Sequence, residues 1–498
     1  WCAVFGLRHL TGPRDQCFNG TIADARIYDR ALTEAELLAL RRGSVAGLAP
    51  VAWWSFAEGF AGDRMGRYTD TVLLNGATMG TDGLVLPGGT SCVVAAPDGV
   101  VQNWLKSQRT PVDHGIPEAR ALRERLLADR HRPGFHFVAP EGRCMPFDPN
   151  GAIYWKGRYH LGYIFQDQRG HCWGHASSRD LLHWRFHEPM LAPAPGDPDR
   201  GIFSGNAFVG KEGQAVALYH GVDAGNCIAT CSEDGLDTWT KLPSNPIVPN
   251  PAPGSPAAAL YRSWDPHGWV QDGRYYAVFG GNPATLFKAG SLDDWSYVGP
   301  LLSHDLPGVD PDEDISCPDL FKIDNIYVLV CISHKRGCRY YLGDFDGTVF
   351  RPRSHARMNW PGGTFFAPES LVDEHGRRIM WAWVLDRRPE ARSAEVGWSG
   401  TMSLPRELSL GADDTLRIRP VAELAALRCE SFPLTDLELP AEGVVDVAGL
   451  RGDMLEIEAT FPAAATGSVG LNVLCDPSGR EATRIEVDRQ AGVVRLDL

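Results

Sequence analysis

Apolar and polar residues alternate through short segments of this chain, and the segments recur at a regular spacing. Five of them open on turn-like motifs: Asp148-Pro149-Asn150-Gly151, Ser204-Gly205-Asn206, Asp265-Pro266-His267-Gly268, Cys317-Pro318-Asp319 and Ala367-Pro368-Glu369. The openings begin 50 to 61 residues apart, and each leads into an alternating strand, a turn and a second strand. Several short strands per repeat, at a period of about 40 to 60 residues, are typical of a β-propeller. The pattern therefore predicts five blades.

The segments on either side of these repeats predict an all-β protein with further domains. Residues 1–99 read as a β-rich region with one helix that begins at a capping box, Thr33-Glu34-Ala35-Glu36. A helical pattern over 117–127 predicts a connector at 100–133. The five-bladed propeller is assigned to 134–428, and alternating residues over 454–461 predict a C-terminal β-sandwich at 429–498. Because the chain starts with Trp1 and stops abruptly in the last sheet, we expect both ends to be truncated.

Composition narrows the classes of partner. The chain has 498 residues, of which 44% are hydrophobic and 22% charged, as in a soluble protein of several domains. Its net charge of −14 disfavours nucleic acid and anionic membrane as partners, since both favour basic patches. The 12 cysteines show no zinc-ligand spacing, so we expect no metal site and no cofactor. Composition leaves the oligomeric state open.

Carboxylates in the blade openings indicate sugar chemistry. The innermost strand of a propeller blade begins near the central axis, so the residues of the openings converge on one pocket. A pocket with two carboxylates suits glycoside hydrolysis, in which one attacks the anomeric carbon and another protonates the leaving oxygen. A single Asp-Pro-x-Gly motif is better explained by a turn, but five openings in register, three of them with acids, favour a site.

The chain from 134 to 498 resembles glycoside hydrolase family 32, the β-fructofuranosidases, invertases, inulinases and levanases. The resemblance rests on the stretches 397–408 and 420–428, on 376–383, and on Phe165-Gln166, Trp173-Gly174-His175-Ala176 and Phe203-Ser204-Gly205. Residues 18–28 and 51–86 are similar to laminin-G-like, concanavalin-type sandwiches in inverted order. That region is expected either to pack against the rest of the chain or to bind carbohydrate.

The resemblance implies roles for the openings. Asp148 matches the nucleophile of the family motif Asn-Asp-Pro-Asn-Gly, and Asp265 matches the transition-state stabiliser of Arg-Asp-Pro. Cys317 follows the position of the family's acid/base Glu, where this chain has Ser316. Phe147 and Trp264 replace the polar residues that precede the two aspartates, which predicts a flatter, less polar wall around the −1 sugar.

Ser316 cannot protonate a leaving group at neutral pH, so the acid has moved or catalysis is lost. Glu369 is the first candidate, since nearby aromatic residues could raise its pKa. Asp314 is the second candidate because it lies two residues before Ser316 and so on the same strand face, and Glu313 is the third. The alternative for Glu369 is a structural ion pair with Arg262 or Arg377.

The sequence therefore predicts a retaining, exo-acting glycoside hydrolase that cleaves β-fructofuranosides or a related furanoside with a relocated acid/base. The catalytic residues are Asp148, Asp265 and Glu369. The expected substrate-binding residues are Phe147, Asn150, Trp155, Gln166, Trp173, Phe203, Ser204, Trp264, Asp314 and Ser316. A non-catalytic sugar-binding propeller, a protein-interaction platform and an arabinofuranosidase are the alternatives. The expected partner is an oligo- or polysaccharide, and the expected location is the periplasm or the outside of the cell.

Overall fold

The computed structural model describes residues 3–5, 19–41, 49–58, 63–65, 70–74, 77–87, 92–96, 128–129, 131–139, 144–302, 306–360, 364–385, 388–435, 437–447, 449–461, 467–476, 478 and 480–497. Strands dominate these residues, as predicted. The chain divides into two compact units, Trp1–Ala119 and Arg120–Leu498. The finer domain boundaries given above stay predictions.

The first unit consists of short antiparallel strands around a small aromatic core. Its sheets are β1 (Ala3–Phe5), β8 (Cys92–Ala96) and β5 (Asp70–Leu74); β2 (Asn19–Ile22), β7 (Gly83–Pro87) and β6 (Thr78–Gly80); and the pair β3 (Ala25–Ile27) and β4 (Ala52–Trp54). Trp54, Phe56, Leu84 and Leu86 are fully buried. The laminin-G-like character of this unit stays a prediction.

The predicted capping box is present at α1 (Glu34–Arg41). The Glu36 N–H donates to Thr33 Oγ1 at 3.4 Å, and the Thr33 N–H donates to a Glu36 carboxylate oxygen at 2.8 Å. The helix predicted over 117–127 lies outside the described residues.

The second unit contains five separate antiparallel sheets, each made of consecutive strands. They are β9 (Pro149–Trp155), β10 (Arg158–Asp167), β11 (Gly170–Ser178) and β12 (Trp184–Phe186); β13 (Ile202–Val209), β14 (Ala215–Gly221), β15 (Gly225–Cys231), β16 (Thr240–Lys241) and β17 (Val248–Pro249); β18 (Pro266–Gln271), β19 (Arg274–Phe279), β20 (Thr285–Ala289) and β21 (Trp295–Pro300); β22 (Ser316–Ile323), β23 (Ile326–Ser333), β24 (Gly337–Phe345) and β25 (Phe350–Arg357); and β26 (Phe365–Val372), β27 (Arg378–Val384), β28 (Thr401–Met402), β29 (Arg406–Leu410) and β30 (Leu416–Pro420).

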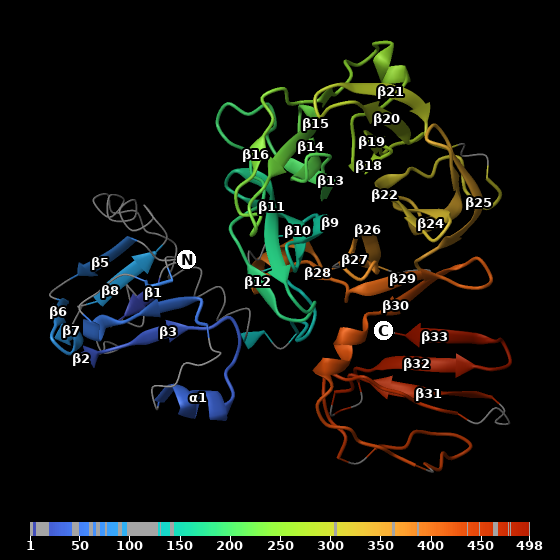
Figure 1. Cartoon of the computed structure of the whole chain (residues 1–498). Helices are drawn as coiled ribbons and strands as arrows, with labels where there is room; N and C mark the ends of the chain where they lie inside the picture. Colours follow the sequence, from blue (N-terminus) through green and yellow to red (C-terminus); the bar gives the residue numbers. More distant parts are fainter. Residues whose placement is uncertain are drawn as a thin grey trace. The chain divides into compact units, whose positions relative to one another are not determined.

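The five sheets are the blades of a propeller. The first strand of each sheet contacts the first strand of the next, in the order β9, β13, β18, β22 and β26, and β26 contacts β9. Figure 1 shows the five sheets arranged around a common centre. Side-chain packing between separate sheets closes the ring, so no single sheet has to close on itself. The five predicted openings stand at or next to the starts of these five inner strands.

The openings have an irregular backbone, which determines the directions in which their side chains point. In four blades the pairing of the inner strand shifts register at the opening, and Asp265, Cys317 and Ala367 have positive φ angles of 34°, 42° and 49°. A β-bulge of this kind bends the strand and redirects side chains. As a result, the first residue of an opening faces the axis while the third residue faces the neighbouring blade.

The third residues form a ring of polar links, which we call the third-residue ring: Asn150, Asn206, His267, Asp319 and Glu369. All five are buried. Four of them hydrogen-bond to the next blade: Asn150 Oδ1 to the Gly205 N–H at 2.9 Å, Asn206 to the Gly268 N–H and C=O at 2.7 and 2.9 Å, Asp319 to the Ser370 hydroxyl, and Glu369 Oε1 to the Ala152 N–H at 2.9 Å. His267 contacts the next blade without a hydrogen bond, its Nε2 lying 3.5 Å from Asp319 Oδ1. Glu369 therefore joins the fifth blade to the first.

The C-terminal residues form a three-stranded antiparallel sheet of β31 (Ser468–Val473), β32 (Thr483–Asp488) and β33 (Val493–Asp497). The strand predicted over 454–461 is wrong, because these residues are described and adopt no strand. Met454 and Ile457 are 60% and 46% exposed, so the alternating apolar side chains have no sheet face to pack on. None of the described helices is long and apolar enough to cross a membrane.

We expect Asn206→Ala to destabilise the propeller, because it leaves the buried Gly268 N–H and C=O without partners. The free energy of unfolding should fall by about 2 to 3 kcal/mol. Urea titration followed by tryptophan fluorescence measures the loss. Asn472→Ala, at an exposed position of β31, is the control and should change little. Equal effects of the two substitutions would contradict a structural role for the third-residue ring.

Candidate active site

Asp148 and Asp265 lie buried on either side of Cys317 at the propeller axis. Each aspartate immediately precedes an innermost strand, β9 or β18. Cys317 Sγ lies 3.8 Å from Asp148 Oδ2 and 3.7 Å from Asp265 Oδ2. The Cys317 N–H donates a hydrogen bond to Asp265 Oδ2 at 3.1 Å. The left-handed backbone of Cys317 thus turns both its amide and its thiol towards the two acids.

One oxygen of Asp148 is left for an incoming molecule. Ser204, the first residue of the second opening, donates its hydroxyl to Asp148 Oδ2 at 2.8 Å. Asp148 Oδ1 is buried and has no hydrogen-bond partner among the described residues. Buried polar atoms are nearly always hydrogen-bonded, so an unpaired one points to a ligand or a catalytic role. We identify Oδ1 as the atom best placed to react.

The site environment favours proton uptake by both aspartates. Burial raises the pKa of Asp148 to about 7; the Ser204 hydroxyl opposes the shift, and the charge of Asp265 adds to it. Burial also raises the pKa of Asp265, against the hydrogen bond from the Cys317 N–H. Two neighbouring carboxyl groups with raised pKa values are characteristic of catalytic sites rather than of surface charges.

Aromatic rings line the second and third blades beside the acids. Phe203 and Trp264 are partly exposed, and their ring centroids lie 6.3 Å apart. His220 packs 4.7 Å from Trp264 on one side, and the Arg262 guanidinium lies 4.1 Å over the Trp264 ring on the other. Phe203 and Trp264 directly precede Ser204 and Asp265, so their rings lie beside the acid site. They form an apolar wall there, as predicted for Trp264.

Four predicted substrate contacts are instead packing residues. Phe147 is fully buried and packs against Phe137 and Tyr163. Trp173 is fully buried as well and donates its indole N–H to the Phe203 C=O. Trp155, at the far end of β9, is 7% exposed and bonds the Glu233 C=O. The Asn150 amide is used within the protein, by the Gly205 N–H and the Asp148 C=O.

These four predictions were wrong because the sequence does not show which face of a strand looks into the core. Gln166, by comparison, is exposed at the end of β10 that lies level with the start of β9, and its role in substrate binding stays a prediction.

Ser316 stands in the place of the missing acid and is bound to Asp314. Its hydroxyl donates to Asp314 Oδ2 at 2.9 Å, and the side chain is buried. Asp314 also accepts the His334 N–H at 3.0 Å and lies 2.6 Å from His334 Nδ1. His334 was not among the predicted residues. A histidine directly after the apolar strand 326–333, which pairs with the opening at Ser316, was the only signal for it.

The other two acid candidates are held by different groups. Glu313 is buried in ion pairs with Arg339 at 3.0 Å and Arg357 at 3.2 Å. Glu369 belongs to the third-residue ring, and burial raises its pKa well above the usual range, against the Ala152 N–H. The ion pair considered for Glu369 is not formed with Arg377, which binds Asp373 and Glu423.

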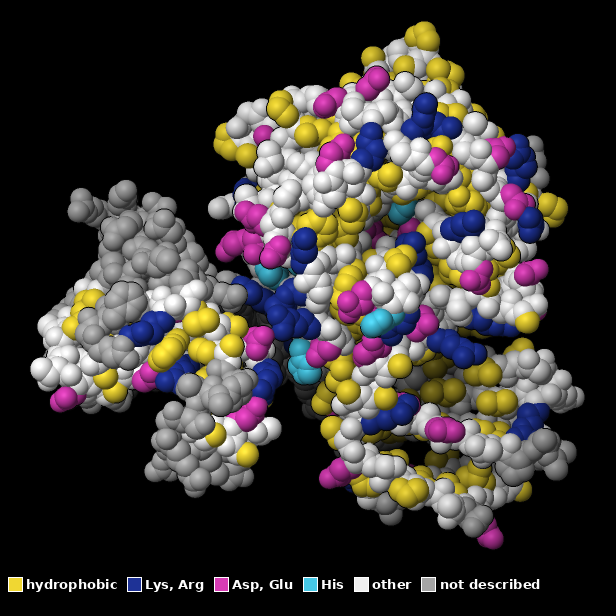
Figure 2. Space-filling model, in the orientation of Figure 1, with side chains coloured by type: hydrophobic (Ala, Val, Ile, Leu, Met, Phe, Trp, Pro, Cys, Tyr) yellow, Lys and Arg dark blue, Asp and Glu magenta, His cyan; other side chains and the backbone are white. Residues whose placement is uncertain are grey.

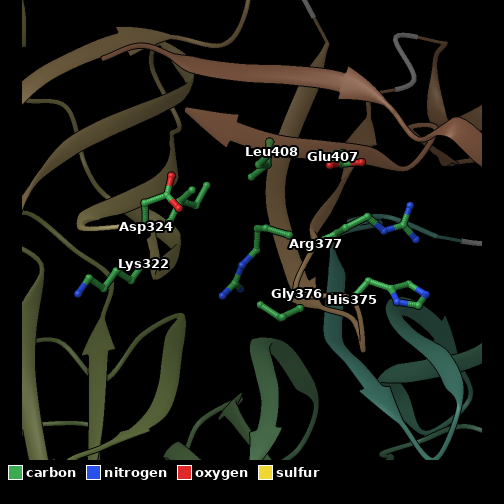
Figure 3. A pocket seen from close by; sticks show the side chains of 10 residues that line it. Lys322, Asp324, His375, Gly376, Arg377, Glu407 and Leu408 are labelled. Atoms are coloured by element: carbon green, nitrogen blue, oxygen red, sulfur yellow. The ribbon is translucent and has the colours of Figure 1, made fainter. Parts of the chain in front are cut away.

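Two further features of this unit lie away from the acids. A hollow lined by Lys322, Asp324, His375, Gly376, Arg377 and Glu407 is shown in Figure 3. It sits at the opposite ends of β22 and β26, about 20 Å along the strands from their openings. His175, His187 and Asp237 could hold a metal ion, since their ligand atoms lie within 4.8 Å of one another. Hydrolysis by carboxylates requires no metal at that place.

Charge on the surface of the protein is mixed. Figure 2 shows acidic and basic side chains interspersed over one face of the propeller, without a large patch of either sign.

Comparison with known proteins gives consistent matches. Residues 136–420 match the family model described as glycosyl hydrolases family 32 N-terminal domain. A sucrose-6-phosphate hydrolase of Salmonella typhimurium is 31% identical over 400 residues, covering 72% of this chain and 80% of that protein. The levanase of Bacillus subtilis is 28% identical over 409 residues, which cover 74% of this chain and 58% of that protein. The solved structure of fructan 1-exohydrolase IIa from Cichorium intybus shares the fold, with a TM-score of 0.59 at 24% identity over 71% of this chain and 77% of that chain.

We expect Asp148→Asn to stabilise the protein at pH 7.5. Burial raises the pKa of Asp148 to about 7, so between about pH 4 and 7 the folded chain binds a proton that the unfolded chain releases. The free energy of unfolding contributed by Asp148 therefore falls as the pH rises through that window.

Melting temperatures at pH 4 and pH 7.5 test this expectation. The variant should melt above the wild type at pH 7.5 and close to it at pH 4. Asp234→Asn, at an exposed position in the second blade, is the control. A variant that melts below the wild type at pH 7.5 would contradict the raised pKa.

Proposed function

Because the chain belongs to glycosyl hydrolase family 32, we propose that it is a retaining, exo-acting hydrolase of β-fructofuranosides or of a related furanoside. Its membership makes it a glycoside hydrolase. The observation that supports the finer proposal is the pair of buried aspartates joined through Cys317, with Asp148 Oδ1 unpaired. Carboxylates buried at the end of a closed ring of blades are within reach of a terminal sugar rather than of the middle of a polymer.

Asp148 is the proposed nucleophile. Its Oδ1 attacks the anomeric carbon, the leaving oxygen departs with a proton, and a glycosyl ester forms on Asp148. Water then attacks the anomeric carbon from the face that the leaving group left, opposite the ester, so the two inversions retain the configuration of the sugar. Asp265 lies beside the reacting carbon and stabilises the positive charge that develops in the transition state.

The proton must come from a residue other than Ser316. Among the carboxyl groups, Asp314 is ionised at neutral pH: burial raises its pKa, but hydrogen bonds with His334 and Ser316 outweigh burial and lower it to about 2. Glu313 is held by two arginines. Burial raises the pKa of Glu369 well above its usual value, although its Oε1 is bound to the Ala152 N–H of the neighbouring blade. The imidazole of His334, which is bound to Asp314, is a further group that can carry a proton.

The nature of the sugar follows from the relatives. Proteins named sucrose-6-phosphate hydrolase, raffinose invertase and levanase align over most of this chain, so a fructosyl unit is the first choice for the −1 position. The apolar wall of Phe203 and Trp264 is the observation that favours the second choice, a furanose such as arabinofuranose with fewer polar contacts.

Release of free sugar tests the proposal. Sucrose, raffinose, inulin, levan and aryl furanosides of fructose and arabinose are incubated with the wild type, Asp148→Asn and the surface control Asp234→Asn. We expect Asp148→Asn to lose about 10³-fold or more of the turnover, with the control unchanged. Proton NMR of the first product should show retained configuration.

Full activity of Asp148→Asn would show that Asp148 is not the nucleophile. A wild type that binds sugar calorimetrically but hydrolyses no member of the panel would instead indicate a non-catalytic, sugar-binding propeller.

A further inference from the structure

A histidine lies beside the vacated acid position, directly after the adjacent strand β23, and shares the carboxylate of Asp314 with Ser316. In the fourth blade Ser316 of β22 pairs with Ile332 of β23. The turn that follows β23 therefore comes level with the residues before Ser316, and His334 is the second residue past Ile332. Topology thus brings an imidazole to the opening where the family's glutamate would stand.

Asp314 binds His334 at its backbone and at its ring. One carboxylate oxygen, Oδ1, accepts the backbone N–H of His334 at 3.0 Å, and the other, Oδ2, lies 2.6 Å from ring Nδ1. The Ser316 hydroxyl donates to the same Oδ2 at 2.9 Å and so orients the carboxylate in turn. With Nδ1 committed to Asp314, Nε2 is the ring nitrogen left to face a substrate.

His334 lies within electrostatic reach of the two aspartates and is open to solvent. Its positive charge lowers the pKa of both Asp148 and Asp265, which places it within electrostatic reach of both. The Phe366 ring meets it edge-on, with centroids 5.9 Å apart. Its side chain is 57% exposed, whereas Glu369 is 9% exposed. A proton donor to the leaving group has to stand on the open side of the sugar, where that group departs.

We propose that His334, oriented by Asp314, is the proton donor and acceptor of the reaction, in place of the glutamate that Ser316 has replaced. This inference rests on the double displacement proposed above. It assigns a catalytic role to His334 and a positioning role to Asp314 and Ser316.

The two steps balance with one proton. In the first step Asp148 Oδ1 forms a bond to the anomeric carbon, the glycosidic bond breaks, and imidazolium Nε2–H passes its proton to the leaving oxygen. In the second step neutral Nε2 takes a proton from water while the water oxygen bonds to the anomeric carbon and the Asp148 ester bond breaks. The imidazolium and the free carboxylate are both restored.

The third-residue ring argues against Glu369 as this donor. Glu369 occupies the same position in its opening as Asn150, Asn206, His267 and Asp319, and like them it links two blades. Its Oε1 is bound to the Ala152 N–H. A carboxyl committed between blades cannot swing to a leaving group without opening the closure of the propeller.

The pH dependence follows from the groups around His334. Asp314 precedes β22, Asp148 precedes β9 and Asp265 precedes β18, and all three favour the charged imidazole. The adjacent Lys335 and Arg336 are paired with Asp312 and Asp310. The hydrogen bond with Asp314 raises the pKa of His334 above its usual value. We expect kcat/KM to rise as Asp148 ionises near pH 7 and to fall at higher pH as His334 loses its proton.

Leaving-group dependence provides the decisive experiment. His334→Ala, Asp314→Asn and Glu369→Gln are compared with the wild type on its best non-aryl substrate and on an aryl furanoside, whose phenolate needs little protonation. His334→Ala should lose about 10²- to 10⁴-fold on the first substrate and far less on the second. Sodium azide, which attacks without a general base, should restore its turnover of the aryl furanoside. Asp314→Asn should move the high-pH limb of kcat/KM to lower pH.

The controls separate folding, this inference and the proposed function. His183→Ala removes an exposed histidine that is also bonded to an aspartate, Asp180, and it should change nothing. Glu369→Gln keeps an oxygen for the Ala152 N–H and should stay within several-fold of the wild type. Melting temperatures show whether each variant is folded. If His334→Ala does not fold, the pH profile of Asp314→Asn still tests the inference.

The inference is overturned if Glu369→Gln shows the leaving-group dependence and His334→Ala does not, or if Asp314→Asn leaves the pH profile unchanged. If the wild type is active but the variants give either of these results, only the role of His334 is wrong and the proposed function is unaffected. A wild type inactive on the whole panel overturns both.

Discussion

The closed circle of polar links between inner strands is the constraint on which the rest of the propeller depends. The five sheets share no backbone ladder, and the third-residue ring places a buried polar contact between every neighbouring pair, to which the backbone bridge between Gly281 and Ile315 adds for the third and fourth blades. A buried polar group costs stability unless it is paired. The ring therefore tolerates only one rotational setting of each blade, and that setting fixes where the axis-facing side chains meet.

The active site inherits its geometry from this ring. In the fourth blade the opening sends its third residue to the next blade and its first residue to the axis, because the bulge redirects the strand. In the third blade, where the pairing does not shift register, the positive φ of Asp265 turns the backbone at the same place. Asp148, Ser204, Asp265 and Cys317 consequently converge although 169 residues of chain separate the first from the last. The strained backbone at Asp265 and Cys317 persists because both the sheet behind it and the bonds in front of it specify the same conformation.

Residue spacing was enough to predict much of this structure. The period of the openings predicted five blades and the meeting of Asp148 with Asp265, since both depend only on where strands begin. It could not predict which face of a strand looks inward: Trp155, Trp173 and Phe147 are buried in the core although aromatic residues at such places often bind sugars. Likewise, alternation over 454–461 predicted a strand where the described residues provide no partner, because a strand requires a second strand as well as a pattern.

The two acids and Ser316 are best understood as one electrostatic system. Asp314 lies within hydrogen-bond distance of the Ser316 hydroxyl, so a glutamate at position 316 would put two carboxylates side by side. With serine there, Asp314 can bind the imidazole, and the imidazolium places a positive charge next to Asp148 and Asp265. That charge opposes the effect of burial on both aspartates and favours the ionised nucleophile. The loss of the family's acid at position 316 and the presence of the Asp314–His334 pair are therefore coupled, and the serine cannot be interpreted without that pair.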